Sequence, residues 1–217
     1  MSAVSAVSTV STVSTVSAKT TTSTWGATYL DLYNKCTHGP WRTSPLDVQW
    51  RLDSDNGLYF QCSASHSDWK HNFLFCPKAV RAYKGSRWYA HEGFLRLWKS
   101  VQDEIMSALS GSTPSIVAGY SQGGALATLA HEDLYFRGIR PNTVTFGSPR
   151  VVWNPFRLNR EIDKRFLQVY NIAVQGDIVT KVPPAIFGYV TEGRTARIGP
   201  LSLPSAANHA KYREYLE

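Results

Sequence analysis

The sequence lacks an apolar run of the roughly 18 to 20 residues that a membrane-spanning helix requires. We also expect that residues 1–24 are not a secretory signal peptide, because they have neither a basic start nor a continuous apolar core. We therefore expect an intracellular location by default, unless the N-terminal repeat serves another route of export or attachment. The three cysteines are odd in number and show no metal-ligand spacing, which predicts free thiols, or at most one disulfide, and no metal site.

Acidic residues are the scarcer charge, with 16 Asp and Glu against 23 Lys and Arg, and the net charge is +7. Such an excess is compatible with binding to nucleic acid or to anionic lipid. The basic residues do not cluster, however, because the densest stretch, 157–165, mixes them with Glu161 and Asp163. We therefore predict an ordinary basic surface, no nucleic-acid partner and at most a mild attraction to anionic lipid surfaces.

The length of 217 residues suits one well-buried domain rather than two. Residues 1–24 form a Ser/Thr/Val tail with a valine at every third position over much of its length, a period that fits neither a helix nor a strand. Because its apolar bulk is too small to offset the entropy of ordering, we predict a disordered tail. A strand-like or adhesive role is the alternative. The folded domain is expected at 25–217.

Within that domain, strand and helix patterns alternate. The pattern predicts a β-hairpin over 48–62, a helix over 91–109, a strand over 143–146, a helix over 157–165 and a strand over 168–174. Strands that alternate with helices favour a mostly parallel sheet with helices on both faces. We therefore predict an α/β fold with the antiparallel hairpin at one edge of the sheet.

A serine lies at the centre of the segment Gly-Tyr-Ser-Gln-Gly-Gly, residues 119–124. A β-branched stretch precedes this segment and an Ala-rich apolar stretch follows it. This strand–turn–helix pattern is typical of the nucleophile elbow of an α/β-hydrolase, in which small residues let the strand and helix pack closely around a strained serine. The bare Gly-x-Ser-x-Gly pattern is a weak signal, and its context strengthens it. Ser121 is therefore the candidate nucleophile.

A serine nucleophile requires a base and an acid that orients the base, and in this fold the chain order is Ser, Asp or Glu, His. Asp177 directly follows a predicted buried strand, whereas its competitor Asp163 lies in a charged helix. His209 is the only histidine after Asp177, and it precedes a short predicted C-terminal helix. His131 lies too far along the elbow helix. We therefore expect Asp177 as the acid and His209 as the base.

Two hydrogen-bond donors are needed to stabilise the oxyanion that develops during ester hydrolysis. In this fold, one donor is the backbone N–H of the residue after the nucleophile, which is Gln122 here. The other comes from the loop after an early strand. The second strand of the predicted hairpin ends at Ser63, which could donate both its N–H and its hydroxyl.

These residues resemble the class 3 lipases, the fungal triacylglycerol lipase family, over nearly all of residues 45–217. The resemblance is carried by five motifs in the family's order: Gln-Cys-Ser at 61–63 with Ser-Asp-Trp at 67–69, His-Glu-Gly-Phe at 91–94, the elbow at 119–125, Phe-Gly-Ser-Pro-Arg-Val at 146–151, and the segment 177–184. The resemblance implies that Ser121, Asp177 and His209 form a catalytic triad. It also implies that Ser63 and Gln122 form the oxyanion hole.

The resemblance also makes residues 64–75 a candidate lid, with Trp69, Phe73 and Phe75 on it. A core-packing helix is the alternative for this segment. His91 is expected to be structural. Three positions depart from the family pattern: Gln61 replaces arginine, Cys62 replaces glycine, and the elbow has Tyr-Ser-Gln in place of His-Ser-Leu.

The predicted function is that of a serine carboxylic-ester hydrolase, a lipase that cleaves acylglycerols or related lipid esters through an acyl-enzyme. The resemblance implies no metal or organic cofactor, and we expect a monomer with transient contact to a lipid interface. A cutinase-like short-chain esterase is one alternative, although the cutinase disulfide framework is missing. A non-catalytic lipid-binding protein on the same scaffold is another alternative. The retained Ser, Asp and His argue against it, because a site that has lost its activity would be expected to lose one of these residues first.

Overall fold

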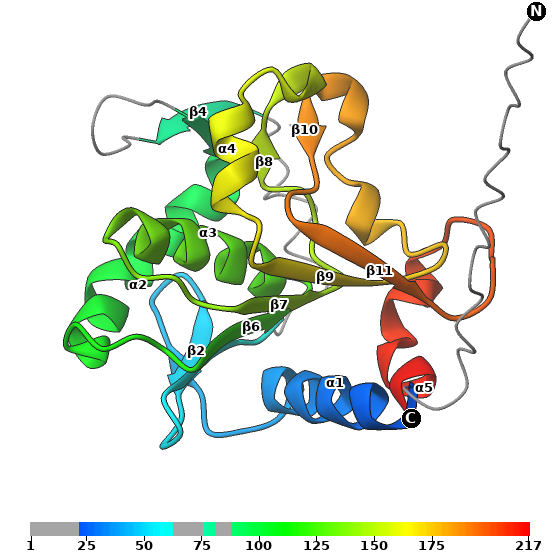
Figure 1. Ribbon diagram of the computed structural model, residues 1–217, viewed down its shortest axis with the longest axis horizontal. Helices are drawn as coiled ribbons and strands as arrows, with labels where there is room; N and C mark the ends of the chain where they lie inside the picture. The colour runs from blue at the N-terminus through cyan, green and yellow to red at the C-terminus, as the bar shows by residue number, and fades with distance from the viewer. Residues whose placement is uncertain (1–21, 63–75, 81–87) are drawn as a thin grey trace, which may run out of the picture.

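Two β-sheets organise the residues that the structure describes, which are 22–62, 76–80 and 88–217 of this computed structural model (Figure 1). The strands are β1 Arg42–Thr43, β2 Gln49–Leu52, β3 Gly57–Phe60, β4 Pro77–Val80, β5 Trp88–His91, β6 Ile116–Tyr120, β7 Thr143–Phe146, β8 Val152–Trp153, β9 Val169–Val174, β10 Tyr189–Val190 and β11 Arg194–Ile198. The helices are α1 Thr22–Thr37, α2 Glu92–Leu109, α3 Gln122–Phe136, α4 Arg160–Arg165 and α5 Tyr212–Leu216, with short 3-10 helices η3 Pro155–Arg157, η4 Val179–Lys181, η5 Ala185–Phe187 and η6 Ala206–Ala210.

The larger sheet has the strand order β1-β2-β3-β6-β7-β9-β11. Strands β3, β6, β7, β9 and β11 are parallel, whereas β1, β2 and β3 pair antiparallel at one edge. In the hairpin, Trp50 lies opposite Phe60, as its alternating pattern predicts. The mostly parallel sheet with an antiparallel hairpin at one edge is therefore confirmed.

Helices cover both faces of this sheet. In Figure 1, α2 and α3 lie on one face, and α1 and α5 lie on the other. One hydrophobic cluster joins the sheet to α2 and α3, and a second joins it to α1 and α5. Because both faces are covered, the parallel strands are apolar on both sides, and all four residues of β3 and of β7 are buried.

The smaller sheet is antiparallel, with the order β10-β8-β5-β4. The sequence pattern did not predict it, because β8 and β10 are only two residues long and their partners lie far away along the chain. This sheet lies on the same side of the larger sheet as α2 and α4 (Figure 1). No helix in the described residues is long and apolar enough to cross a membrane.

One predicted helix begins later than expected, and a helix that was not predicted begins before the expected start of the folded domain. The predicted helix 157–165 begins at Arg160 instead, because Phe156 and Arg157 have positive φ angles of 53° and 51° and Asn159 caps the helix through Ile162 N. Helix α1 begins at Thr22, three residues before the expected start of the folded domain, while residues 1–21 of the predicted tail lie outside the described residues. The short C-terminal helix is present as α5.

Two histidines are completely buried away from the serine elbow, and burial lowers the pKa of each from its ordinary value of 6.5 to about 4. His131 lies between the Thr143 hydroxyl and the Arg165 carbonyl, at 2.9 Å from each. Because a carbonyl only accepts, Nε2 carries the proton and Nδ1 accepts from Thr143, so the neutral ring satisfies both neighbours. His91 packs its ring against Phe94 at a centroid distance of 4.6 Å.

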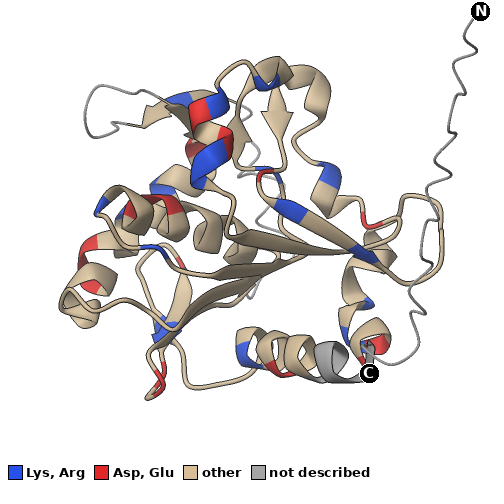
Figure 2. Cartoon of the chain, in the orientation of Figure 1, with Lys and Arg blue, Asp and Glu red and all other residues tan. Residues whose placement is uncertain are grey.

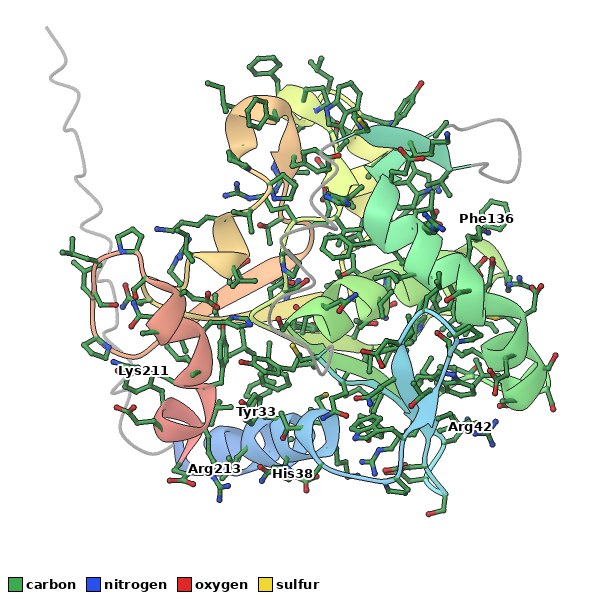
Figure 3. The ribbon with its side chains drawn as sticks, turned by 180° about the vertical axis from the view of Figure 1, so that it is seen from behind. Tyr33, His38, Arg42, Phe136, Lys211 and Arg213 are labelled. Carbon is green, nitrogen blue, oxygen red and sulfur yellow. The ribbon has the colours of Figure 1, made fainter. Side chains whose placement is uncertain are left out.

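These neutral histidines predict that the fold loses stability in mild acid. Between pH 6.5 and 4 the unfolded chain binds protons that the folded chain excludes, so the free energy of unfolding falls as the pH falls through this window. His131→Gln should reduce that fall by about 3 kcal/mol, measured by urea unfolding at pH 7 and pH 4. The exposed His38 at the end of α1 (Figure 3) supplies the control His38→Gln. Equal pH dependence in both variants would contradict the prediction.

Candidate active site

Ser121 occupies the sharp turn between β6 and α3. Its φ of 56° and ψ of −122° lie in a region that residues other than glycine rarely adopt, at a cost of about 1–3 kcal/mol. The turn is held by the Ser121 N–H, which donates to the Phe146 carbonyl at 2.8 Å. The serine is 7% exposed. The predicted elbow is therefore present, with a strained serine at its apex.

The glycines of the elbow allow the strand and the helix to approach each other. A Cβ on Gly119 would clash with the Gly123 carbonyl, and a Cβ on Gly123 would clash with the Phe60 carbonyl at the end of β3. Two neighbouring strands and the start of α3 therefore meet backbone to backbone. This close contact places the first turn of α3 beside the residues that follow β3.

Asp177 and His209 form a buried hydrogen-bonded pair. The Asp177 Oδ2 accepts from His209 Nδ1 at 2.8 Å and from the Tyr212 hydroxyl at 2.7 Å, while its Oδ1 accepts from Val179 N at 2.9 Å. Asp177 is 0% exposed and His209 is 6% exposed. Burial, and then the Asp177 charge, raises the pKa of Tyr212, so its hydroxyl stays protonated and donates to the carboxylate.

The His209 ring lies beside the residue that precedes Ser121. The Tyr120 ring stacks on it at a centroid distance of 5.0 Å, and the Tyr120 hydroxyl donates to the His209 carbonyl at 2.6 Å. Gly147, at φ 58°, also lies against this ring, because a Cβ there would be 2.7 Å from His209 Cε1. Nδ1 is committed to Asp177, and the buried Nε2 bonds to no described residue. Nε2 is therefore available to exchange a proton.

The predicted oxyanion hole is described only in part. Gln122 is the first residue of α3, where backbone N–H groups have no partner within the helix and the helix dipole favours negative charge. Ser63 and the candidate lid residues Trp69, Phe73 and Phe75 lie outside the described residues. Gln61, which stands where the family has arginine, donates from its side chain to the Thr37 carbonyl at 3.4 Å and so ties the end of β3 to α1.

The competing candidates lie elsewhere. Asp163, on α4, bonds with Arg157 and Asn154, and His131 lies between Thr143 and Arg165. In the described part of the chain, no group of three or more His, Cys, Asp or Glu could hold a metal.

Two tyrosines around the Asp–His pair were missed by the sequence analysis. Tyr212 could have been suspected, because it lies three residues after His209 and one helical turn brings such residues to the same side. Tyr120 lies in the elbow itself, at the position where the family has histidine. Its contact with His209 depends on how the C-terminal segment docks, which no local pattern in the sequence reveals.

This geometry defines an α/β-hydrolase with a serine at the strand–helix elbow and an Asp–His pair beside it. The sequence profile of the class 3 lipases matches residues 58–187. The chain belongs to this family, as its motifs predicted.

Relatives and solved structures agree with this assignment. The chain is 34% identical over 128 residues to secreted mono- and diacylglycerol lipase 1 of Fusarium solani, covering 56% of this chain and 37% of that protein. It is 31% identical over 156 residues to a lipase of Rhizomucor miehei, and the match covers 66% of this chain and 42% of that lipase. The chain thus spans about two fifths of the length of these curated relatives.

Two solved structures show the same fold. The lipase from Rhizopus microsporus var. chinensis is 27% identical with a TM-score of 0.59, covering 76% of this chain and 62% of that one. A triacylglycerol lipase whose catalytic centre is described as a serine protease triad is 28% identical with a TM-score of 0.59, covering 74% and 66%. The predicted α/β-hydrolase fold is thus confirmed.

The Tyr212 hydroxyl is predicted to position the acid. Tyr212→Phe removes one of three hydrogen bonds to Asp177 and leaves Val174 N, which donates to that hydroxyl at 3.1 Å, without its acceptor. We expect kcat for a soluble ester to fall roughly tenfold with KM unchanged, and stability to fall by about 1–3 kcal/mol. The control is Tyr215→Phe on the same helix. If both variants keep wild-type kcat, Tyr212 does not position Asp177.

Proposed function

We propose that this chain is a serine carboxylic-ester hydrolase that acts on lipid esters. The observation that supports it most is the hydrogen-bonded Asp177–His209 pair, whose free Nε2 lies beside the strained elbow that carries Ser121. The family supports a lipid ester as substrate, because the relatives are named lipases. The serine, aspartate and histidine all come from one chain, which supports a monomer as the active form.

In the proposed mechanism, His209 Nε2 takes the proton of the Ser121 hydroxyl as the oxygen attacks the ester carbonyl. Asp177 holds the imidazole in the tautomer that accepts at Nε2 and stabilises the imidazolium that forms. Gln122 N–H, with Ser63 as the second donor, stabilises the oxyanion. The alcohol leaves with the proton from His209. Water, activated by the same histidine, then attacks the acyl-enzyme and releases the carboxylic acid.

Hydrolysis of p-nitrophenyl butyrate tests this proposal directly. Wild-type protein should turn the ester over, and Ser121→Ala should reduce kcat by at least about a thousandfold, because the residual rate comes only from binding and oxyanion stabilisation. A fluorophosphonate probe should label the wild type at Ser121 and leave the variant unlabelled. Absence of both turnover and labelling would favour the non-catalytic lipid-binding alternative. A strong preference for short chains over long-chain acylglycerols would favour a cutinase-like esterase.

We further propose where the chain contacts a lipid interface. Four strongly exposed apolar side chains lie on two neighbouring segments around η3 and η5: Phe156 at 93%, Ile186 at 88%, Leu158 at 78% and Phe187 at 56% exposure. We name these four residues the apolar tip. The two segments are joined by hydrogen bonds from Trp153 Nε1 to the Phe187 carbonyl and from Asn154 N to the Gly188 carbonyl. Grouped apolar exposure of this kind marks a surface that contacts a partner or a membrane.

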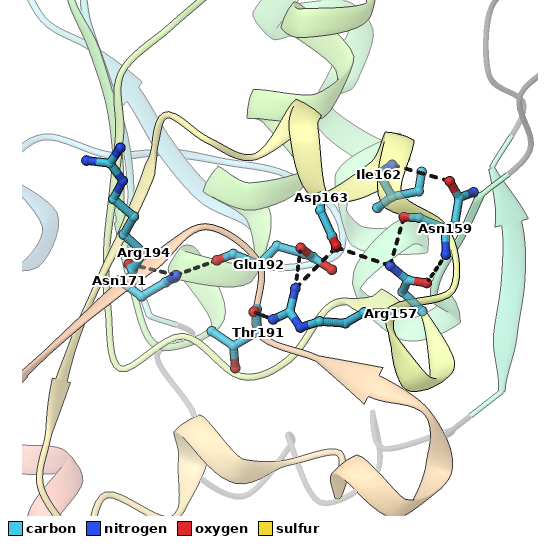
Figure 4. Close-up of polar contacts among 9 residues, drawn as sticks. Arg157, Asn159, Ile162, Asp163, Asn171, Thr191, Glu192 and Arg194 are labelled. Atoms are coloured by element: carbon cyan, nitrogen blue, oxygen red, sulfur yellow. Dashed lines mark hydrogen bonds and ion pairs between the residues drawn. The ribbon is translucent and has the colours of Figure 1, made fainter. Parts of the chain in front are cut away.

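The backbone at the apolar tip is strained and firmly held. Phe156 and Arg157 both have positive φ, which is costly for side chains of their size. The Arg157 guanidinium bonds to Asp163 at 3.2 Å, to the buried Glu192 at 3.3 Å and to the Thr191 carbonyl at 2.7 Å (Figure 4). A fold that accepts this strain and still leaves a phenylalanine in water supports a role for that side chain outside the core.

Replacing two residues of the apolar tip tests this interface. Phe156→Ser with Ile186→Ser should weaken binding to neutral phospholipid vesicles by at least roughly tenfold, because each large apolar side chain contributes about 1.5–3 kcal/mol when buried. Hydrolysis of soluble p-nitrophenyl butyrate should be unchanged, which separates docking from chemistry. The control is Leu46→Ser, an exposed leucine beside the hairpin edge of the sheet. Equal vesicle binding by the wild type and the double variant in a flotation assay would rule out this surface.

A further inference from the structure

A cavity of about 440 Å³ lies on the face of the large sheet at β9 and β11, separate from Ser121. Its floor is formed by paired residues of the two strands: Asn171 lies opposite Thr195, and Ala173 lies opposite Arg197. Its walls come from η4, η5 and β10 and from the segment after β7 that carries Arg150.

The lining of this cavity contains four basic residues, Arg150, Arg157, Lys181 and Arg197, and no acidic residue among the described positions. Arg157 is already neutralised by its ion pairs with Asp163 and Glu192 (Figure 4). The other three form no ion pair with any described residue. The cavity therefore concentrates positive charge that the described part of the fold does not balance.

Hydrogen bonds to the neighbouring backbone hold the Arg150 side chain in the wall of the cavity. Its Nη1 donates to the carbonyls of Lys181 at 2.8 Å and Pro183 at 3.0 Å, and its backbone N–H donates to the Val182 carbonyl at 2.7 Å. Its Nη2 and Nε groups bond to no described residue. Partial burial, and then the nearby Arg197 charge, lowers the pKa of Arg150, as expected for two cations that face one another. An anion between them would relieve this repulsion.

Arg197 lies on the cavity face of β11, because successive side chains of a strand point to opposite faces of the sheet. Thr195 and Arg197 lie on the cavity face, whereas Arg194 lies on the opposite face, over the Tyr170 ring at 5.8 Å. Asn171 is not available to a ligand, because its side chain bonds to Thr145 and to the Glu192 carbonyl. The polar groups of the cavity that remain available therefore include the cationic donors and the Thr195 hydroxyl.

We propose that this cavity binds a phosphate group through Arg150, Lys181 and Arg197. A phosphate offers up to two negative charges and several acceptor oxygens, which suits two guanidinium forks and an ammonium better than a single carboxylate does. The group is either free phosphate or the phosphomonoester headgroup of a lipid. An occupant would contact Thr180 and Lys181, and the Thr180 hydroxyl donates to the Asp177 carbonyl at 2.9 Å, so the ligand would touch the segment that carries the acid.

Titration calorimetry with inorganic phosphate tests the site without requiring any esterase activity. At constant ionic strength set with potassium chloride, the wild type should show saturable binding. Arg197→Gln and Lys181→Gln should each weaken it roughly tenfold or more, since each removes a charge-assisted hydrogen bond. Arg194→Gln is the matched control, with the same charge change on the same strand but on the opposite face, and should change the affinity less than twofold.

Vesicles separate the two sources of phosphate. Binding to phosphatidic acid vesicles in preference to phosphatidylglycerol vesicles, lost in Arg197→Gln and kept in Arg194→Gln, would identify the lipid headgroup as the ligand. Saturable binding of inorganic phosphate with no such lipid preference would identify a soluble phosphate. If neither probe binds the wild type saturably, or if Arg194→Gln weakens binding as much as Arg197→Gln does, the proposal is overturned.

Discussion

The carboxylate of Asp177 is completely buried, and a buried charge is tolerated only when its lone pairs are satisfied. Two of the three groups that satisfy it, His209 and Tyr212, come from the last residues of the chain, and the third is the backbone of Val179. The C-terminal segment η6–α5 must therefore dock for the sheet to keep this aspartate in place. Folding of the C-terminus and assembly of the proposed site are thus one event.

The docking of that segment depends in turn on α1. Tyr33 of α1 packs edge-on against Tyr120 and Phe146, with centroid distances of 5.2 and 5.5 Å, and stacks on Tyr212 at 6.1 Å. Figure 3 shows Tyr33 on α1, beside the helix that carries Arg213. These rings fill the layer below the sheet and hold the backbone around the elbow from beneath. The N-terminal helix, the elbow and the C-terminal helix therefore support one another.

How much the sequence could predict depended on whether the signal was local. The elbow, the hairpin and β9 were predicted because their patterns lie within a few consecutive residues. The small sheet was not, since β8 and β10 acquire their strand character only from distant partners. The start of α4 was placed too early because composition alone did not reveal that Arg157 turns away to pair with Asp163 and Glu192. The candidate triad was reached by chain order, a rule of the fold rather than of local pattern, and its catalytic roles stay a prediction.

The distribution of charge is a second property that local sequence patterns did not predict. Along the sequence, the basic residues do not cluster, which predicted an ordinary basic surface. The fold nevertheless brings Arg150, Lys181 and Arg197 to one cavity from three separate segments, and Figure 2 shows basic residues on β11. Ala185 of η5 also lines this cavity, so it adjoins the segment that carries Ile186 and Phe187 of the apolar tip. Apolar side chains that enter a lipid layer and cations that meet its phosphates would therefore act from neighbouring parts of one surface.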